Sequence, residues 1–176
     1  MWERLRLLAE LPDHGSGDAA AVLAPLFEDT EGEVRLILTK RPLTMPTHAG
    51  HIAFPGGRPD PGDSGPVDTA LREAAEEVGI EPDSVDVLGF LPPIHTVEFS
   101  LMVVPVVGRL QGSLRLRPDP REVDKILLPR LADLADESRW RSEDWRGRTV
   151  WFYDLDGEVL WGATARMVRQ LVGLEG

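Results

Sequence analysis

The sequence predicts an α/β fold of the α+β type, in which a mixed β-sheet lies between α-helices. Short apolar runs typical of strands outnumber the helical segments, and the two kinds do not alternate regularly along the chain. A doubly wound parallel sheet would require that alternation. The length of 176 residues and the hydrophobic content of 42% suit one folded domain over residues 1–176.

The first expected elements are a helix and a hairpin. Trp2–Glu10 reads as a short amphipathic helix, which the Gly-containing segment 14–17 ends. Two apolar runs, Val22–Phe27 and Val34–Thr39, flank a polar segment. This pattern is typical of antiparallel strands joined by a long turn.

The clearest helix is expected over Val67–Val78, after a loop rich in Pro and Gly. Its apolar residues recur at helical spacing, and Gly79 follows where a left-handed residue would end the helix. The loop before it runs over residues 55–66, and the segment Ile52–Phe54 precedes that loop. Long loops next to helices are common places for functional residues, so we expect one here.

Most elements after this helix are expected to be strands. Asp156–Gly157 is a strong hairpin signal, and Ala163–Leu171 has the pattern of a closing helix. Trp161 precedes two small residues and is interpreted as a packing residue. The other expected elements are strands at Val85–Leu91, Phe99–Val107, Val123–Leu128, Val150–Leu155 and Glu158–Trp161, and a short helix at Leu131–Glu137.

The composition excludes several classes of function. Thirty acidic residues against 19 basic ones give a formal charge of -11, whereas a non-specific nucleic-acid binder or an anionic-membrane binder needs a basic face. The chain has no cysteine, which excludes disulfides, thiolate metal sites and cysteine nucleophiles. The longest apolar run, Leu101–Val107, is too short to span a bilayer. We therefore expect a cytoplasmic protein that binds neither nucleic acid nor membranes.

Three glutamates share one face of the expected helix at 67–78. Glu73, Glu76 and Glu77 have i,i+3 and i,i+4 spacing, so each like-charged pair costs about 0.2–0.5 kcal/mol. Arg72 reaches Glu76 at i+4, but one cation does not neutralise three carboxylates. A solvated acidic face is one interpretation. The other is a divalent cation such as Mg²⁺ or Mn²⁺, which takes carboxylate oxygens.

The loop before the helix adds to the case for a cation. Gly56 and Gly57 allow an unusual backbone path and leave a carbonyl oxygen available to a metal ion. Asp60 and Asp63 add two acids near the start of the helix. The helix dipole favours acids at that end, so capping is a competing explanation for them.

The segment of about residues 57–80 resembles the Nudix box, usually written G-x5-E-x7-R-E-U-x-E-E-x-G-U with U aliphatic. From Arg72 to Ile80 every fixed position matches. In the first half Asp63 takes the place of Glu, and eight residues rather than seven separate it from Arg72. Nudix enzymes hydrolyse nucleoside diphosphates linked to another moiety, with divalent cations held by the box, and their fold is a mixed sheet between helices.

This resemblance assigns roles to individual side chains. The implied ligands of Mg²⁺ or Mn²⁺ are the carboxylates of Glu73, Glu76 and Glu77 and the carbonyl of Gly57. Arg72 would hold the carboxylates in place. The general base is open between Glu76 within the box, Glu122 at the head of an expected strand, and Glu98.

A narrower resemblance covers most of the chain. Ile37–Arg41, Gly50 and Phe54–Gly57 resemble the signature L-L-T-K-R-[SA]-x3-R-x3-G-x3-F-P-G-G of the coenzyme A pyrophosphatase branch, with the spacing kept throughout. Pro42 replaces the small residue and Pro46 the second Arg. Other segments that resemble this branch are 104–108, 122–125 and 161–166.

The narrower resemblance implies hydrolysis of coenzyme A or its derivatives to 3′,5′-ADP and 4′-phosphopantetheine. One alternative keeps the chemistry and changes the substrate to ADP-ribose, a dinucleotide or an altered nucleoside triphosphate. Another is a non-catalytic nucleotide-sensing domain with the same fold. The crowded carboxylates argue against the last, because a binding module has no need of them.

Local cations matter because both the protein and a diphosphate are anionic. The candidate substrate contacts lie around the glycine loop and are Lys40, Arg41, Arg58 and His51. Arginine suits bidentate phosphate contacts, although these charges could equally serve solubility, and His51 could make a loop hydrogen bond. The expected partner is a small-molecule nucleoside diphosphate, and the amphipathic N-terminal segment is compatible with a homodimer.

Overall fold

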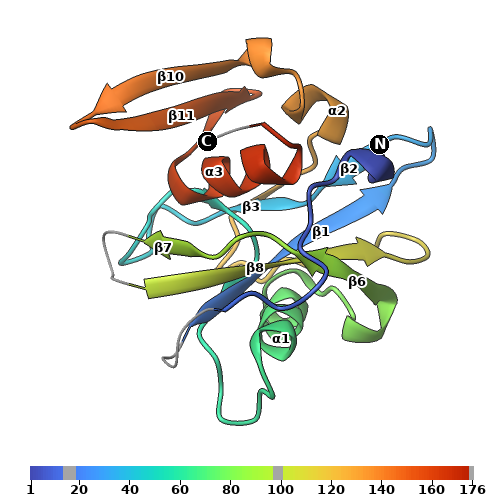
Figure 1. Ribbon diagram of the computed structural model, residues 1–176. Coiled ribbons are helices and arrows are strands. Elements are labelled where there is room, and N and C mark those ends of the chain that lie inside the picture. Colours follow the sequence, from blue (N-terminus) through green and yellow to red (C-terminus); the bar gives the residue numbers. More distant parts are fainter. Residues whose placement is uncertain (14–18, 97–100, 175–176) are drawn as a thin grey trace.

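A six-stranded mixed sheet forms the centre of the molecule. The structure is a computed structural model that describes residues 1–13, 19–96 and 101–174. Helix α1 (Pro66–Val78) covers one face of the central sheet, and helix α3 (Gly162–Leu171) lies on the other side (Figure 1). This architecture confirms the predicted fold class.

The central sheet has the order β2-β1-β8-β6, with β5 paired to β1 and β7 paired to β8. Only the pairing of β1 with β8 is parallel among the pairs described. Its strands are β1 (Ala20–Glu28), β2 (Val34–Leu36), β5 (Gly56–Gly57), β6 (Val85–Phe90), β7 (Ile94–Thr96) and β8 (Leu101–Leu110).

Two three-stranded sheets complete the β structure. One has the order β4-β3-β9 and the other the order β10-β11-β12. Their strands are β3 (Leu38–Lys40), β4 (Ile52–Ala53), β9 (Lys125–Leu127), β10 (Trp140–Trp145), β11 (Arg148–Leu155) and β12 (Glu158–Trp161). The remaining helical segments are the short helix α2 (Leu131–Leu134) and 3-10 turns at Trp2–Arg4, Pro82–Ser84 and Glu137–Arg139.

Strand β1 separates two hydrophobic cores because its side chains alternate between the faces of the sheet. Leu23 and Phe27 lie in the core under α1, while Ala24 and Leu26 lie in the core that contains α3. Helix α1 inserts its small and apolar residues, including Ala70, Ala74 and Val78, into the first core. Its glutamates are therefore held at the border of that core. Among the described residues, no helix is long and apolar enough to cross a bilayer.

The predicted hairpin of β1 and β2 is confirmed, with Leu26 opposite Leu36. The second expected strand, however, is divided at Ile37, whose N–H donates to the Pro25 carbonyl at 3.0 Å. After this break the chain leaves the central sheet and continues as β3, which pairs with β4 and β9. The division brings the segment after β3 next to the segment before β9.

The predicted helix over Trp2–Glu10 is wrong apart from a 3-10 turn at Trp2–Arg4. Leu8 instead forms an antiparallel bridge with Phe90 at the end of β6. The N–H of Leu8 donates to the Phe90 carbonyl at 2.8 Å, and the reverse bond measures 2.9 Å. These two bonds to the sheet edge replace the helical hydrogen bonds that the amphipathic pattern suggested.

Candidate active site

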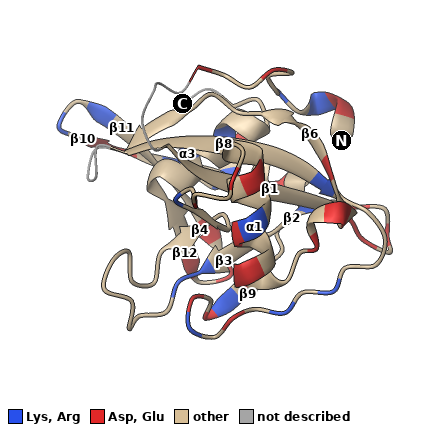
Figure 2. Ribbon diagram, turned by 90° about the horizontal axis from the view of Figure 1, so that it is seen from below, with Lys and Arg blue, Asp and Glu red and all other residues tan. Residues whose placement is uncertain are grey.

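Arg72 on α1 is the centre of a network of ion pairs. Its guanidinium lies 3.0 Å from Asp63 Oδ2, 3.1 Å from Glu73 Oε1 and 3.3 Å from Glu76 Oε1. Its Nη2 also donates to the Arg58 carbonyl at 2.9 Å. The predicted i,i+4 pair of Arg72 with Glu76 is confirmed. Arg72 thus joins the loop before the helix to two of the three crowded glutamates, and Figure 2 shows acidic residues on both sides of a basic segment of α1.

Asp63 fixes Arg72 from the loop. Its carboxylate accepts hydrogen bonds from Arg72, from Thr69 Oγ1 at 2.8 Å and from the Asp60 N–H at 2.9 Å. The Arg72 hydrogen bond is the main cause that holds the pKa of Asp63 well below its usual range. The capping explanation for Asp63 is wrong, since the N-cap of α1 is Gly65 and Asp63 binds side chains and the loop instead.

Glu77 is buried at the inner edge of the same helix face. Its residue surface is 6% exposed, and the Gly56 N–H donates to its Oε1 at 3.4 Å. Burial, followed by the negative charge of Glu122, raises the pKa of Glu77 to about 8, while Arg41 opposes the shift. A carboxylate in this position therefore carries a charge that the surrounding protein only partly offsets.

Glu73 lies against the glycine loop. A Cβ atom at Gly57 would lie 2.5 Å from Glu73 Oε1, so a side chain at this position would displace the Glu73 carboxylate. Pairing of Gly57 with Ala21 of β1 fixes the backbone at this point. Burial raises the pKa of the Glu73 carboxyl, and the charges of Glu76 and Glu122 add to the shift. The structure thus brings Gly57 and Glu73 into contact.

Glu122 approaches the box from elsewhere in the chain. It lies in a turn before β9, in which its N–H donates to the Asp119 carbonyl at 3.0 Å. Its charge raises the pKa of both Glu73 and Glu77, so it acts on both of these carboxyl groups. Glu76 is half-exposed at the rim. Glu98 lies outside the described residues.

The pairing of β3 with β9 explains how two distant residues reach the site. Lys40 is opposite Lys125. Arg41, which follows β3, and Glu122, which precedes β9, therefore lie at the same end of the small sheet. The Nε atom of Arg41 is buried and has no hydrogen-bond partner among the described residues. The N–H of Arg41 donates to the His51 carbonyl at 2.9 Å. An unsatisfied donor beside the glutamates is suited to an anionic ligand.

The other candidate contacts are placed differently. Lys40 Nζ lies 2.9 Å from Glu158 on β12, and Lys125 Nζ lies 3.6 Å from the same carboxylate. The side chain of Arg58 is exposed, and its carbonyl serves Arg72. The ring of His51 lies edge-on to Trp161, with centroids 5.0 Å apart. Of these four candidates, Arg41 carries a charge that lowers the pKa of Glu77.

The oxygen donors fit a hard divalent cation in their chemistry. The charge of Glu122 raises the pKa of Glu73 and of Glu77, and Gly57 leaves space beside Glu73. Among the described residues, no group of three or more His, Asp or Glu side chains already converges on one point. A cation that binds these oxygens would draw together carboxylates that otherwise repel.

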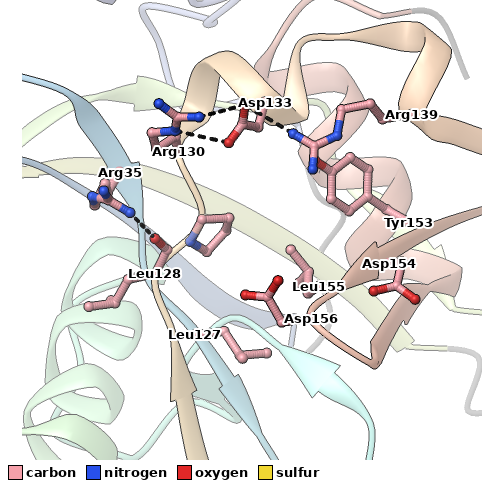
Figure 3. A pocket seen from close by; sticks show the side chains of 11 residues that line it. Arg35, Leu127, Leu128, Arg130, Asp133, Arg139, Tyr153, Asp154, Leu155 and Asp156 are labelled. Atoms are coloured by element: carbon pink, nitrogen blue, oxygen red, sulfur yellow. Dashed lines mark hydrogen bonds and ion pairs between the residues drawn. The ribbon is translucent and has the colours of Figure 1, made fainter.

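A cavity of about 190 Å³ between β2, α2 and β11 is separate from these carboxylates (Figure 3). Its charged lining is balanced. Arg130 and Arg139 both pair with Asp133, at 3.0 and 2.9 Å, and Arg35 donates to the Leu128 carbonyl at 2.9 Å. The acidic cluster on α1, and not this cavity, is therefore the candidate active site.

Comparison with known proteins agrees with the residues assembled above. Residues 17–153 match the family model described as NUDIX domain. The Arabidopsis thaliana protein called Nudix hydrolase 22, chloroplastic, is 43% identical over 159 residues, which cover 85% of this chain and 52% of that protein. The Nudix hydrolase NudL of Photorhabdus laumondii is 40% identical over 156 residues, which cover 86% of this chain and 82% of that protein. The chain thus spans about half the length of the plant relative.

Solved structures resemble the fold at low sequence identity. A NUDIX hydrolase from Alicyclobacillus acidocaldarius superposes with a TM-score of 0.56 at 17% identity, covering 94% of this chain and 93% of that one. A C. elegans Ap4A hydrolase in a binary complex gives 0.55 at 21% identity, covering 65% of this chain and 81% of that one. At such identities the likeness concerns the fold alone.

Proposed function

Since the chain belongs to the Nudix hydrolase family, we propose that its substrate is coenzyme A or a derivative, cleaved at the diphosphate to 3′,5′-ADP and 4′-phosphopantetheine. The observation that supports the catalytic part is the crowding of Glu73, Glu77 and Glu122 beside Gly57. The support for coenzyme A is the sequence pattern from Ile37 to Gly57, whose spacing is intact.

Nudix hydrolases use divalent cations, and the donors of this site suit Mg²⁺ or Mn²⁺. The residues that would hold the cation are Glu73, Glu76, Glu77 and the carbonyl of Gly57. When bound, such a cation neutralises phosphate oxygens and lowers the pKa of water. The protein positions the carboxylates through a chain of contacts, in which Asp63 holds Arg72 and Arg72 holds Glu73 and Glu76.

Glu122 is proposed as the general base that takes a proton from the attacking water. Its charge raises the pKa of Glu73 and Glu77, whereas the carboxylate of Glu76 is paired with Arg72 at the rim. Replacement of Glu122 and of Glu76 by Gln, one at a time, separates the two candidates. The base is the residue whose Gln variant loses turnover while it still binds Mn²⁺. Unchanged turnover in the Glu122→Gln variant removes Glu122.

Arg41 is proposed to bind the diphosphate. Its buried Nε donor has no partner in the described protein, and its charge lies close enough to Glu77 to lower that pKa. An arginine in this position contacts phosphate oxygens next to the cation site. Lys40 instead neutralises Glu158 and supports the strand that precedes Arg41.

A second substrate class is favoured by one departure from the coenzyme A signature. Pro46 occupies the position of the second signature Arg and is exposed, so a cation that the signature provides is missing there. ADP-ribose or a dinucleotide needs the diphosphate chemistry but has no 3′-phosphate to bind. The two classes are therefore distinguished by the 3′-phosphate of coenzyme A.

Incubation with Mg²⁺ or Mn²⁺ and a panel of coenzyme A, dephospho-coenzyme A, ADP-ribose and diadenosine tetraphosphate tests the proposal. We expect the highest kcat/KM with coenzyme A, with 3′,5′-ADP as a chromatographic product. Faster cleavage of ADP-ribose would show that the coenzyme A assignment is wrong. Nucleotide binding without cleavage of any compound would favour the sensing domain.

A further inference from the structure

The sheet β10-β11-β12 carries aromatic side chains on both faces. Side chains alternate along each strand, and one face packs under α3 through residues that include Trp140, Tyr153 and Leu160. The opposite face mixes five apolar side chains with charged ones. The apolar ones are Trp145, Val150, Phe152, Val159 and Trp161, and the charged ones are Arg141, Glu143, Arg148 and Asp154. Antiparallel sheets with one solvated face usually place polar residues there. Trp161, which the sequence predicts to be a packing residue, packs against Phe152 and His51 but keeps 37% of its surface exposed.

Part of this outer face is an ordered row of rings. Arg141 Cζ lies 4.5 Å from the centroid of Phe152, and the rings of Phe152 and Trp161 are within 16° of parallel. The Trp161 ring is followed by His51 at 5.0 Å, and His51 by His48 at 5.2 Å. Cross-strand pairing of Phe152 with Trp161 holds the two aromatic planes side by side.

The row ends at the candidate active site. His51 accepts a hydrogen bond from the N–H of Arg41 through its carbonyl, at 2.9 Å. Arg41 in turn lies beside Glu77, and its buried Nε is the donor proposed for the diphosphate. Glu158, on the same strand as Trp161, binds Lys40 next to Arg41. A ligand with phosphate at Arg41 can therefore extend along the row.

We propose that the exposed ring of Trp161 stacks the nucleobase of the diphosphate substrate, with Phe152 packed behind the indole and His51 at its edge. A planar base fits this surface because stacking needs a flat aromatic partner and tolerates different bases. The assignment rests on the proposed hydrolysis of a nucleoside diphosphate derivative, and it does not depend on coenzyme A as the substrate.

Trp145 offers a matched control on the same face. It is 58% exposed and pairs with Arg148 at the far end of the β10–β11 hairpin, away from the row that includes His51. Trp161→Leu and Trp145→Leu each remove one exposed indole from the same sheet. If the ligand bound this face through non-specific apolar contact, both substitutions would weaken binding equally.

Two measurements on the Mg²⁺-loaded protein test the assignment. The first is the Kd of ADP by calorimetry, which we expect to rise about tenfold in Trp161→Leu and to stay unchanged in Trp145→Leu. The second is hydrolysis of a nucleoside diphosphate derivative against a dialkyl diphosphate without a base. In Trp161→Leu, KM for the first should rise about tenfold with little change in kcat, and the base-free compound should be unaffected. Trp161→Phe should restore most of the affinity.

The outcomes separate this assignment from the proposed function. An unchanged Kd for ADP in Trp161→Leu overturns the stacking assignment, even where hydrolysis by the parent supports the function. If ADP binds tenfold more weakly to Trp161→Leu but the parent hydrolyses none of the compounds, the stacking assignment is supported and the proposed hydrolysis is overturned. Loss of a dimer in both Leu variants, measured by sedimentation with the ADP Kd unchanged, would identify the face as a contact between copies of this chain.

Discussion

Two charged side chains are buried in the described part of the chain, and their surroundings are opposite. Arg169 on α3 is 1% exposed, and its Cζ lies 3.5 Å from the centroid of Trp151 and 5.3 Å from that of Trp140. Its Nη2 donates to Glu137 at 3.3 Å. Every one of these contacts favours the charged form, so this charge contributes to packing of the β10–β11 hairpin on α3.

Glu77 on α1 is buried among groups of its own sign. Glu73 and Glu122 oppose its charge, and the long Gly56 hydrogen bond and Arg41 favour it. A buried charge with too few opposite partners costs stability. The surroundings of Arg169 thus favour its charge, whereas those of Glu77 leave its charge to be offset by the proposed cation.

The largest effect is expected from Glu77→Gln. The variant keeps the shape of the side chain and removes the charge of a proposed metal ligand, so kcat with Mg²⁺ should fall about 10³-fold, equivalent to several kcal/mol of charge stabilisation. Glu81→Gln is the control, since Glu81 is an exposed residue just beyond the same helix. Turnover of Glu77→Gln within threefold of the parent would remove this residue from the metal site.

The second largest effect is expected at Arg169, the other buried charge. Arg169→Ala removes the side chain held between two tryptophans and should lower the free energy of unfolding by about 3 kcal/mol. The measurement is urea unfolding of the variant and of Arg166→Ala, an exposed arginine on the same helix. Activity per folded molecule should stay unchanged. A kcat loss in Arg169→Ala at full folding would contradict the purely structural role of this charge.

A smaller effect is expected from Asp63→Asn, which weakens the anchor of Arg72. Residues that orient metal ligands typically contribute 10- to 100-fold to metal affinity or activity, so we expect a loss of about 30-fold in kcat/KM. Asp60→Asn is the control, because Asp60 is exposed and lies 3.8 Å from Arg72. Equal losses in both variants would show that the charge of the loop matters and not the specific contact.

The sequence predicts α1 and the β11–β12 hairpin because their signals are local. The helix has apolar residues at helical spacing, and Gly79 ends it with a φ of 72°. Asp156 and Gly157 both have positive φ at the hairpin turn, as the Asp-Gly pair requires. Each of these features depends on residues within one or two turns of the chain.

Other elements depend on partners that no local pattern reveals. The strand β10 consists of Trp140–Trp145, whose exposed residues are mostly charged, and it forms because β11 pairs with it. The extended path at Leu8 likewise depends on the edge of β6 at Phe90. The glutamates of α1 are local to one helix, but Arg41 and Glu122 meet only through the β3–β9 pairing. A sequence motif can therefore suggest Glu122 for the site but cannot show its position.

The smallest expected effect is a pH dependence that sets Glu77 apart from Arg169. Because the pKa of Glu77 rises from the ordinary 4.5 to about 8 in the folded protein, the folded state holds a proton that the unfolded state releases. This contribution to stability is complete below pH 4.5 and is lost as the pH rises through about 8. Glu77→Gln has no such proton to lose.

Thermal unfolding in EDTA at pH 5.5 and pH 8 measures this difference. From pH 5.5 to pH 8, the free energy of unfolding of Glu77→Gln should rise by about 2 kcal/mol relative to that of the parent. This corresponds to roughly 4–8 °C in Tm for a chain of this size. Arg169→Ala should show the same loss at both pH values, because guanidinium groups do not titrate in that range. Saturating Mg²⁺ should remove the advantage of Glu77→Gln at pH 8, since the cation favours the charged carboxylate. An advantage of equal size at both pH values would mean that Glu77 is not protonated on folding, and the contrast between the two buried charges would then rest on geometry alone.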